Sequence, residues 1–153
     1  GIIHKAITRK GKDITRKMTN VHSVPLSVPT KDTIQIRGEL YTKDVAGNVS
    51  QRIAAGYLRS KSFIPNVNLT FCAFQIINTN MDQFTELQFL RLSLGFDVPS
   101  WSLTDIVHIE KYRRSWLNKN LYCGTPTDGI VVKINDYLLQ KTRPDYWQIA
   151  IKY

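Results

Sequence analysis

Residues 128–134 of this chain, Asp-Gly-Ile-Val-Val-Lys-Ile, constrain its fold more than any other stretch. An Asp-Gly pair is typical of a tight turn, and the β-branched run that follows it predicts a strand. Because side chains alternate along a strand, Ile130 and Val132 share one face, whereas Val131 and Lys133 share the other. An ammonium in so apolar a strand costs free energy unless an anion compensates it, and phosphate is a common partner of lysine. We therefore interpret Lys133 either as a phosphate ligand or as a solvated lysine on a half-exposed strand.

Three further segments, residues 33–41, 68–77 and 146–153, alternate with the period of a strand. On the first of them, Glu39 shares a face with Arg37, and a surface ion pair between the two is the usual outcome. If that face lines a pocket instead, the Glu39 carboxylate becomes an acceptor for the hydroxyl groups of a ligand.

Phe74 lies on the second of these segments, on the face expected to hold Thr70, Cys72 and Ile76 as well. An aromatic residue on such a strand is most often part of the core, but on a ligand-facing strand it would stack on a base. Lys152 projects from the last segment, so a second cation stands on a second apolar strand.

Helical periodicity predicts two helices, at residues 82–94 and 103–117. Gly95 is expected to end the first, which we interpret as a packing element without chemistry. The second is expected to be capped by Thr104 or Asp105 and to turn four residues inward: Ile106, Ile109, Tyr112 and Trp116.

The N-terminal region is expected to begin with a strand over residues 1–8, followed by a basic turn and a short helix that runs from Asp13 towards Val21. No internal repeat or flexible linker interrupts the chain. Residues 1–153 are therefore predicted to form a single α+β domain, with antiparallel-leaning sheets flanked by helices.

Positive charge dominates the sequence. Lys and Arg outnumber Asp and Glu by 21 to 12, a formal net charge of +9, and the first twenty residues hold six basic side chains against one carboxylate. These six are Lys5, Arg9, Lys10, Lys12, Arg16 and Lys17. A surplus of this size favours a polyanionic partner or a phosphate-rich ligand.

Cys72 and Cys123 lie in apolar surroundings, and we interpret both as inert packing thiols of a reducing compartment. Two cysteines cannot complete a four-ligand zinc site, and His108 has no second ligand at a suitable spacing, so no metal-ligating residue is predicted. No apolar run approaches the length of a membrane span, and the basic N-terminus lacks the apolar stretch of a signal peptide. We expect a soluble cytoplasmic protein with no membrane partner.

Residues 50–60 place Ala54-Ala55-Gly56 between Arg52 and Arg59. Small residues in a row allow two backbones, or a backbone and a ligand, to approach closely. The two flanking arginines could then reach the same anion.

Five motifs occur in the order and rough spacing of one family, at residues 36–39, 54–59, 71–74, 128–133 and 147–153. On these motifs the chain resembles the nucleotidyltransferase (adenylation) domain of NAD-dependent DNA ligases, from just after the nucleophile motif to the last motif. The glutamate-bearing strand and the DGxxxK strand are shared with ATP-dependent ligases and capping enzymes. The Ala-Ala-Gly-x-Leu-Arg segment points to the NAD branch. The resemblance implies the ATP-grasp-like nucleotidyltransferase fold.

The resemblance also implies a role for each matching residue. Glu39 would hold the ribose of the adenylate, Phe74 would stack on adenine where the family usually has tyrosine, and Val131 would pack on the other side of the base. Lys133 and Lys152 would contact the α-phosphate and offset the charge that develops as the phosphoryl group is transferred.

Three arginines match the family to different degrees. Arg9 resembles the arginine of its Thr-Arg-Gly-Asp-Gly loop, although Lys-Gly-Lys follows here in place of the acidic part. Arg59 matches a nucleotide-site arginine, whereas Arg52 matches its partner only if one residue is deleted. The resemblance further implies NAD and Mg²⁺ as cofactors, and nicked double-stranded DNA as the substrate.

The sequence departs from the family at the nucleophile. Its covalent step needs the lysine of a Lys-x-Asp-Gly motif, and the one Asp-Gly pair here, at 128–129, has no lysine two residues earlier. We therefore expect the C-terminal part of an adenylation domain, incomplete at its N-terminal side and unable to adenylate itself. A second polypeptide that carries the lysine would then be a partner. Two alternatives stay open: an ATP- or GTP-dependent nucleotidyltransferase related to RNA ligases or capping enzymes, and a non-enzymatic nucleic-acid-binding remnant.

Overall fold

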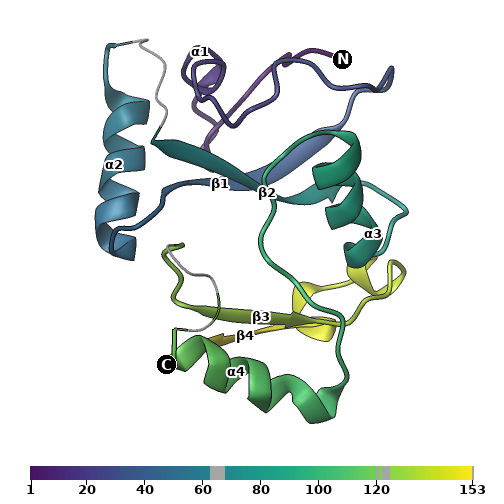
Figure 1. Cartoon of the computed structure of the whole chain (residues 1–153). Helices are drawn as coiled ribbons and strands as arrows, with labels where there is room; N and C mark the ends of the chain where they lie inside the picture. The colour runs from purple at the N-terminus through teal and green to yellow at the C-terminus, as the bar shows by residue number, and fades with distance from the viewer. Residues whose placement is uncertain (63–67, 120, 122–124, 153) are drawn as a thin grey trace.

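The computed structural model describes residues 1–62, 68–119, 121 and 125–152. Within these residues the chain has a mixed α+β architecture with two separate two-stranded antiparallel sheets, β1–β2 and β3–β4 (Figure 1). The strands are β1 (Gln35–Thr42), β2 (Leu69–Ile77), β3 (Gly129–Lys133) and β4 (Gln148–Lys152). The α-helices are α1 (Thr15–Met18), α2 (Gly47–Arg59), α3 (Gln83–Gln88) and α4 (Ile109–Leu117). Short helical turns are the π-helical η1 (Phe89–Ser93) and the 3₁₀ turns η2 (Ile106–His108), η3 (Leu139–Lys141) and η4 (Pro144–Tyr146).

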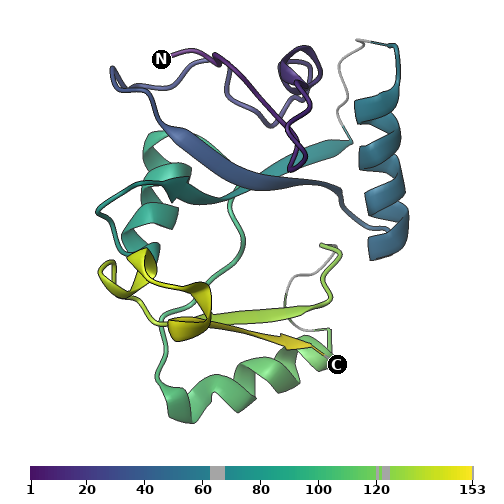
Figure 2. The same ribbon diagram turned by 180° about the vertical axis from the view of Figure 1, so that it is seen from behind.

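The larger half of the molecule is built on the β1–β2 sheet. The N-terminal segment and α1 lie on one face of this sheet, and β3–β4 with α4 lies beyond the other face (Figures 1 and 2). The main core fills the first face, because the apolar positions of β2 meet apolar residues of the N-terminal segment and of α3–η1 there. Its fully buried members include Val21, Leu69, Ala73 and Leu90.

A β-bulge in β2 interrupts the expected alternation. Gly38 pairs with Ala73 but Arg37 pairs with Gln75, so Phe74 is an extra residue without a partner on β1. The bulge turns Ile76 into the core, where it is 6% exposed. The prediction that Ile76 shares a face with Phe74 was therefore wrong.

Helix α3 begins at a side-chain cap, Asp82, and the helical segment ends at the stop that the sequence predicted. The Asp82 carboxylate accepts a hydrogen bond from the Thr85 backbone N–H at 2.8 Å, which satisfies a free donor of the first turn. The helix continues as the π-turn η1 and stops at Gly95, whose φ of +78° lies in the left-handed region. Leu87, Leu90 and Leu94 point into the core.

The smaller half packs α4 against β3 and β4. Trp116, Ile130 and Trp147 form its buried centre, and the Trp116 indole N–H donates to the Thr127 hydroxyl at 3.0 Å. The Asp105 cap was predicted and is present, since its carboxylate accepts from the His108 N–H. Ile106, predicted to face inward, is 82% exposed because it lies in the 3₁₀ turn before α4, where the helical period does not apply.

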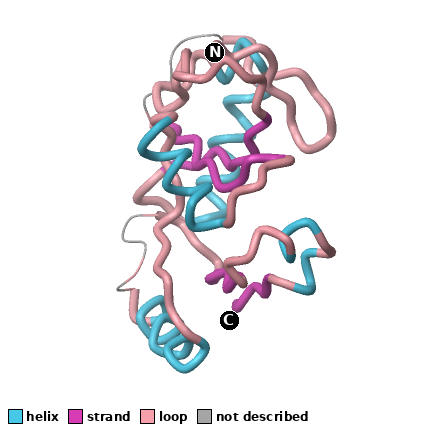
Figure 3. The backbone as a smooth tube through the Cα atoms, turned by 90° about the vertical axis from the view of Figure 1, so that its right-hand side faces the viewer, coloured by secondary structure: helices cyan, strands magenta, loops and turns pink. Residues whose placement is uncertain are grey.

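Residues around the start of α3 join the two halves. The Phe84 backbone N–H donates to the Asn135 side chain at 2.9 Å, and Lys141 donates to the Asn80 side chain at 2.8 Å. Seen from the side, the two strand pairs form an upper and a lower layer (Figure 3). The space between the layers is therefore bordered by the non-core face of β1–β2.

Three expectations for the N-terminal third are corrected. Residues 1–8 form no strand, because Ile2 and Ile7 make only isolated bridges, to Ser27 and Asp13, before the chain turns back. Helix α1 ends at Met18, short of Val21. Helix α2, where no helix was assigned, holds the Ala-Ala-Gly segment.

In that segment only Ala54 is buried. A Cβ added to Gly56 would meet no atom within 4 Å, so no other backbone approaches it.

Candidate functional site

The face of the β1–β2 sheet opposite the core carries Glu39 and Tyr41 on β1, and Cys72 and Phe74 on β2. Glu39 lies directly across from Cys72 in the register. Because the core fills the opposite face, these residues belong to the face of the sheet that is turned towards the layer of β3 and β4 (Figure 1). The polar face that the sequence predicted on β1 therefore lies on the β3–β4 side of the sheet, where Glu39 itself remains exposed.

Acceptor groups gather at the middle of this face. The Asp97 carbonyl accepts from the Ala73 N–H at 2.8 Å, which holds Asp97 beside β2. Burial, assisted by the nearby Asp97 and Glu39 carboxylates, raises the pKa of the Cys72 thiol to about 11. Burial also raises the pKa of the Tyr41 hydroxyl. Cys72 is therefore a neutral thiol, and the surrounding charge favours ligands that donate hydrogen bonds.

Lys133 lies at the end of β3, half-buried between the two layers. Its Nζ donates to Oε1 of Gln83 at 2.6 Å and lies 5.7 Å from the centre of the Trp147 ring. Burial lowers the pKa of this ammonium, and the Glu86 carboxylate partly opposes that effect. The partner of Lys133 is thus a neutral amide, so the cation keeps donors and charge for an anion.

Glu86 is a buried carboxylate, 3% exposed, behind the Gln83 amide. Its Oε1 accepts from the Ile76 backbone N–H, and its Oε2 lies 3.4 Å from Nε2 of Gln83. Burial raises the pKa of Glu86, while the Ile76 N–H and the Lys133 charge lower it. Nε2 of Gln83 also donates to the Phe74 carbonyl at 3.2 Å. One amide therefore connects Lys133 on β3 to Phe74 on β2.

Lys152 lies on the same face of the β3–β4 pair as Lys133, but at its other end. Lys152 pairs with Gly129, and Lys133 with Gln148, a separation of four residues, or about 13 Å along the strand. The Lys152 Nζ forms an exposed ion pair with Asp128 at 3.0 Å. Val131, between the two lysines on this face, is 57% exposed.

The predicted arginines stand apart from these groups. Arg9 is exposed beside the turn that closes at Gly11, and Arg59 is exposed at the end of α2. The C-terminal part of α2 packs on α1, where the Tyr57 hydroxyl donates to the Lys17 carbonyl at 2.9 Å. Among the described residues, no hydrogen bond or ion pair joins either arginine to Glu39, Phe74, Val131 or the two lysines.

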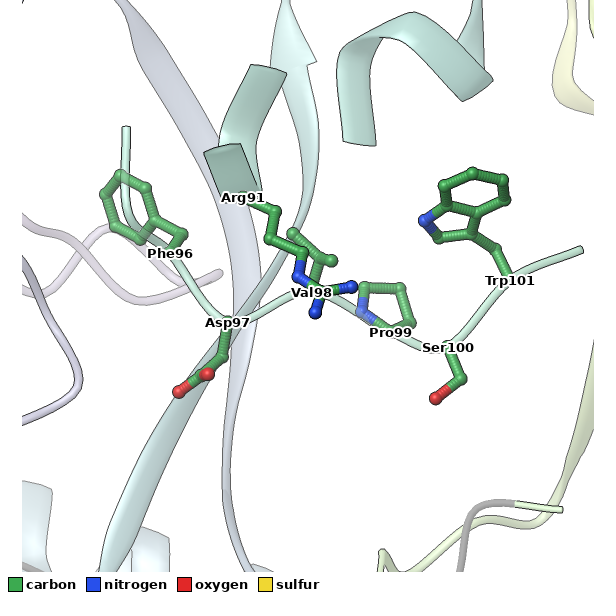
Figure 4. Close-up of a pocket in the computed structure, with 7 residues that line it drawn as sticks. All are labelled: Arg91, Phe96, Asp97, Val98, Pro99, Ser100 and Trp101. Atoms are coloured by element: carbon green, nitrogen blue, oxygen red, sulfur yellow. The ribbon is translucent and has the colours of Figure 1, made fainter. Parts of the chain in front are cut away.

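A shallow hollow of about 430 Å³ lies along residues 96–101, with Arg91 as its remaining lining residue (Figure 4). The Arg91 side chain reaches over Val98 and Pro99. None of the site residues that were predicted from the sequence lines this hollow. The described residues hold no group of three or more metal-ligating side chains, and none of their helices has the length and apolar character needed to span a membrane. Cys123 lies outside the described residues.

Sequence reasoning missed Gln83 and Glu86, because the segment that holds α3 was interpreted as packing alone. A signal was present: both residues fall on the buried stripe of the helix, in the spacing of Leu87, Leu90 and Leu94. A carboxylate and an amide on such a stripe need polar partners. The structure supplies them through Lys133 and the backbone of β2.

Comparison with known proteins adds a relationship over the whole chain. No protein-family model matches it. It is 27% identical over 185 residues to a DNA ligase of Mesoplasma florum, 28% identical over 185 residues to one of Petrotoga mobilis, and 25% identical over 189 residues to one of Buchnera aphidicola. Each alignment covers 100% of this chain and 28% of the relative, so the chain spans little more than a quarter of the length of these relatives. The chain is therefore a distant relative of a segment of bacterial DNA ligases.

Proposed function

We propose that this chain forms part of the adenylation domain of a NAD-dependent DNA ligase, and that the adenylate lies between the β1–β2 face and Lys133. The observation that carries the proposal is the state of Lys133. It is a half-buried ammonium whose hydrogen-bond partner is a neutral amide, and the amide holds it beside Phe74. The relationship to bacterial DNA ligases supports the same reading.

The charges on the two layers suit the two ends of an adenylate. Glu39 and Asp97 make the middle of the β1–β2 face rich in acceptors, which favours ribose hydroxyls and disfavours phosphate. Lys133 supplies the positive charge for the α-phosphate. In this proposal Phe74 stacks on the adenine, and the exposed Val131 covers the base from the other layer.

Lys152 is the second proposed phosphate ligand. It is paired with Asp128, but both side chains are largely exposed, at 63% and 83%, and such pairs contribute at most about 1 kcal/mol. Exchange of Asp128 for a phosphate is therefore inexpensive. We propose that Lys152 moves to the nucleotide when it binds, whereas Lys133 is already held in place.

Residues and groups beyond these two layers are also proposed to contribute to binding. Arg9 and Arg59 are proposed as further nucleotide contacts, which requires the nucleotide to extend past the acceptor face. Mg²⁺ is usually held by substrate phosphates, waters and one or two carboxylates. The lack of a metal-ligand cluster among the described residues is compatible with a Mg²⁺ that arrives with the nucleotide. The net charge of +9 supports nicked duplex DNA as the partner.

In this proposal the chain does not perform the covalent step by itself. The phosphoramidate bond forms when a lysine nitrogen attacks the α-phosphorus and the nicotinamide mononucleotide leaves. Lys133 and Lys152 are assigned to charge stabilisation, and both must stay protonated in that role. The sequence holds no Lys-x-Asp-Gly motif. The attacking lysine would therefore come from a polypeptide outside these residues.

Intact mass measurement tests the proposal. The chain is incubated with NAD and magnesium, alone and with a polypeptide that carries the Lys-x-Asp-Gly part of the domain. We expect no change alone and one AMP on the lysine of the added polypeptide. An AMP adduct on this chain by itself would overturn the assignment of Lys133 and Lys152. Labelling from ATP but not from NAD would move the chain to the ATP-dependent nucleotidyltransferases.

Titration calorimetry with AMP tests the binding site directly. We expect weak binding by the wild-type chain, a loss of affinity of about tenfold or more in Lys133→Met, and a smaller loss in Lys152→Met, which first has to leave Asp128. The control is Lys31→Met, an exposed lysine in the loop before β1 to which the proposal assigns no ligand contact. No AMP binding, together with salt-dependent binding to nicked and intact duplex alike, would instead support a nucleic-acid-binding remnant.

A further inference from the structure

Gln83 is the point where the two layers of the candidate site meet. It is the first residue of α3, directly after the Asp82 cap, so its backbone is held by the start of the helix. Its side chain touches three groups: the Lys133 ammonium at 2.6 Å, the Phe74 carbonyl at 3.2 Å and the Glu86 carboxylate at 3.4 Å. The contact with Lys133 joins residues 50 positions apart.

The contacts determine which way the Gln83 amide is turned. The Phe74 carbonyl and the Glu86 carboxylate both accept hydrogen bonds, so they require the NH₂ group on their side. The amide oxygen then faces Lys133, which only donates. With the amide reversed, an oxygen would face two acceptors and an NH₂ group would face an ammonium. The orientation is therefore set by three polar groups at once.

We infer that Gln83 is the positioning residue that sets the Lys133 ammonium at a fixed place relative to Phe74, so that one amide aligns the phosphate-binding and base-stacking parts of the site. This inference rests on the proposed function. A neutral acceptor is suited to positioning Lys133, because it restrains one N–H of the ammonium. The positive charge and the other two N–H groups are left for a phosphate. A carboxylate in its place would hold Lys133 by charge and repel the ligand.

Glu86 serves as the anchor behind Gln83. It lies one turn further along α3 and is tied to β2 through the Ile76 N–H. A continuous chain of hydrogen bonds therefore runs from β2 through Glu86 and Gln83 to Lys133 on β3. The Gln83 amide, which the Glu86 carboxylate orients, separates that carboxylate from the ligand.

A double-mutant cycle on AMP affinity, measured by calorimetry, tests the inference. We expect Gln83→Ala to weaken AMP binding by about fivefold or more in the wild-type background and by less than twofold in the Lys133→Met background, since the effect acts through Lys133. Gln83→Met, which keeps the length and bulk of the side chain, should lose as much as Gln83→Ala, and Gln83→Glu should lose more. Gln75→Ala is the matched control: it removes the partner of Arg37 on the same strand as Phe74 and should leave the affinity unchanged.

A second measurement separates this inference from the proposed function. In the ligand-free chain, the NMR signal of the Lys133 side-chain Cε, assigned with Lys133→Met, should shift in Gln83→Ala and Gln83→Met but not in Gln75→Ala. If wild-type chain binds AMP and loses affinity in Lys133→Met, but Gln83→Ala and Gln83→Met bind as wild type, the inference is overturned while the proposed function stands. If no AMP binds, the proposed function fails. A Lys133 signal that does not respond to either Gln83 variant overturns the inference whether or not AMP binds.

Discussion

Replacement of Gly38 by alanine should destabilise the whole chain, although the change adds a single methyl group. Gly38 lies in β1 beside the bulge, and its missing side chain would point to the core face. An added Cβ would lie 2.4 Å from the Cys72 carbonyl oxygen and 2.5 Å from Cζ of the Phe71 ring. The Phe71 ring itself packs edge-on against Phe96, at 6.1 Å between ring centres. Neither neighbour can withdraw easily.

The size of the effect follows from these distances. Cβ contacts below 3.0 Å essentially never occur, so the Cys72 carbonyl or β1 must move by at least 0.6 Å, the difference between 3.0 and 2.4 Å. Overpacking of a core costs about 1–3 kcal/mol, and we expect the upper part of that range because a backbone atom and a confined ring are both displaced. For a chain of this size each kcal/mol shifts the Tm by roughly 2–4 °C. We therefore expect a fall of about 4–12 °C.

Gly56→Ala is the matched control. Gly56 lies in α2, and a Cβ there would meet nothing within 4 Å. Alanine should therefore raise the free energy of unfolding by about 0.5–1 kcal/mol through helix propensity. Both substitutions restrict the unfolded chain in the same way, so the difference between them reports the folded state. Thermal unfolding followed by circular dichroism measures both. Shifts of the same sign, or a Gly38→Ala chain as stable as wild type, would refute the reasoning.

Three further outcomes are expected. Asp82→Ala should lower the free energy of unfolding by about 1 kcal/mol at pH 7, as measured by denaturant titration. The Thr85 N–H holds the pKa of Asp82 below its ordinary 3.8 in the folded chain, so the difference between variant and wild type should fade as the pH falls through that lowered pKa. An equal difference at pH 2 would contradict the cap. Leu90→Ala should lower the free energy of unfolding by about 2–5 kcal/mol in the same titrations, because Leu90 is 0% exposed, whereas Leu92→Ala, at a side chain that is 76% exposed, should change it little. Equal effects of the two substitutions would be inconsistent with the core described. Cys72 should react with iodoacetamide at pH 8 at least about a hundredfold more slowly in the folded chain than in urea, because the pKa of its thiol in the folded chain is about 11. Peptide masses would measure the labelling, and fast labelling of the folded chain would refute this.

The amino-acid sequence by itself determined the elements whose signals are local. The strands near residues 33–41, 68–77, 128–134 and 146–153 were predicted within a few residues, because side-chain alternation is set by immediate neighbours. The position of Lys133 on the face that carries Val131 follows from the same alternation. Gly95 could be assigned as a stop because a left-handed residue favours glycine.

Tertiary structure decided the features that depend on which elements meet. Ile76 enters the core only because β1 and β2 pair with a bulge, and a one-residue change of register reverses every later side chain. Residues 1–8 contain three isoleucines, which favour a strand, but they find only isolated bridges, so they form no ladder. The contact between Gln83 and Lys133 spans 50 positions, and no periodicity within either segment encodes it. Near neighbours along the chain can specify the shape of an element and the face of a residue, but the partner across a gap is chosen by how the elements pack.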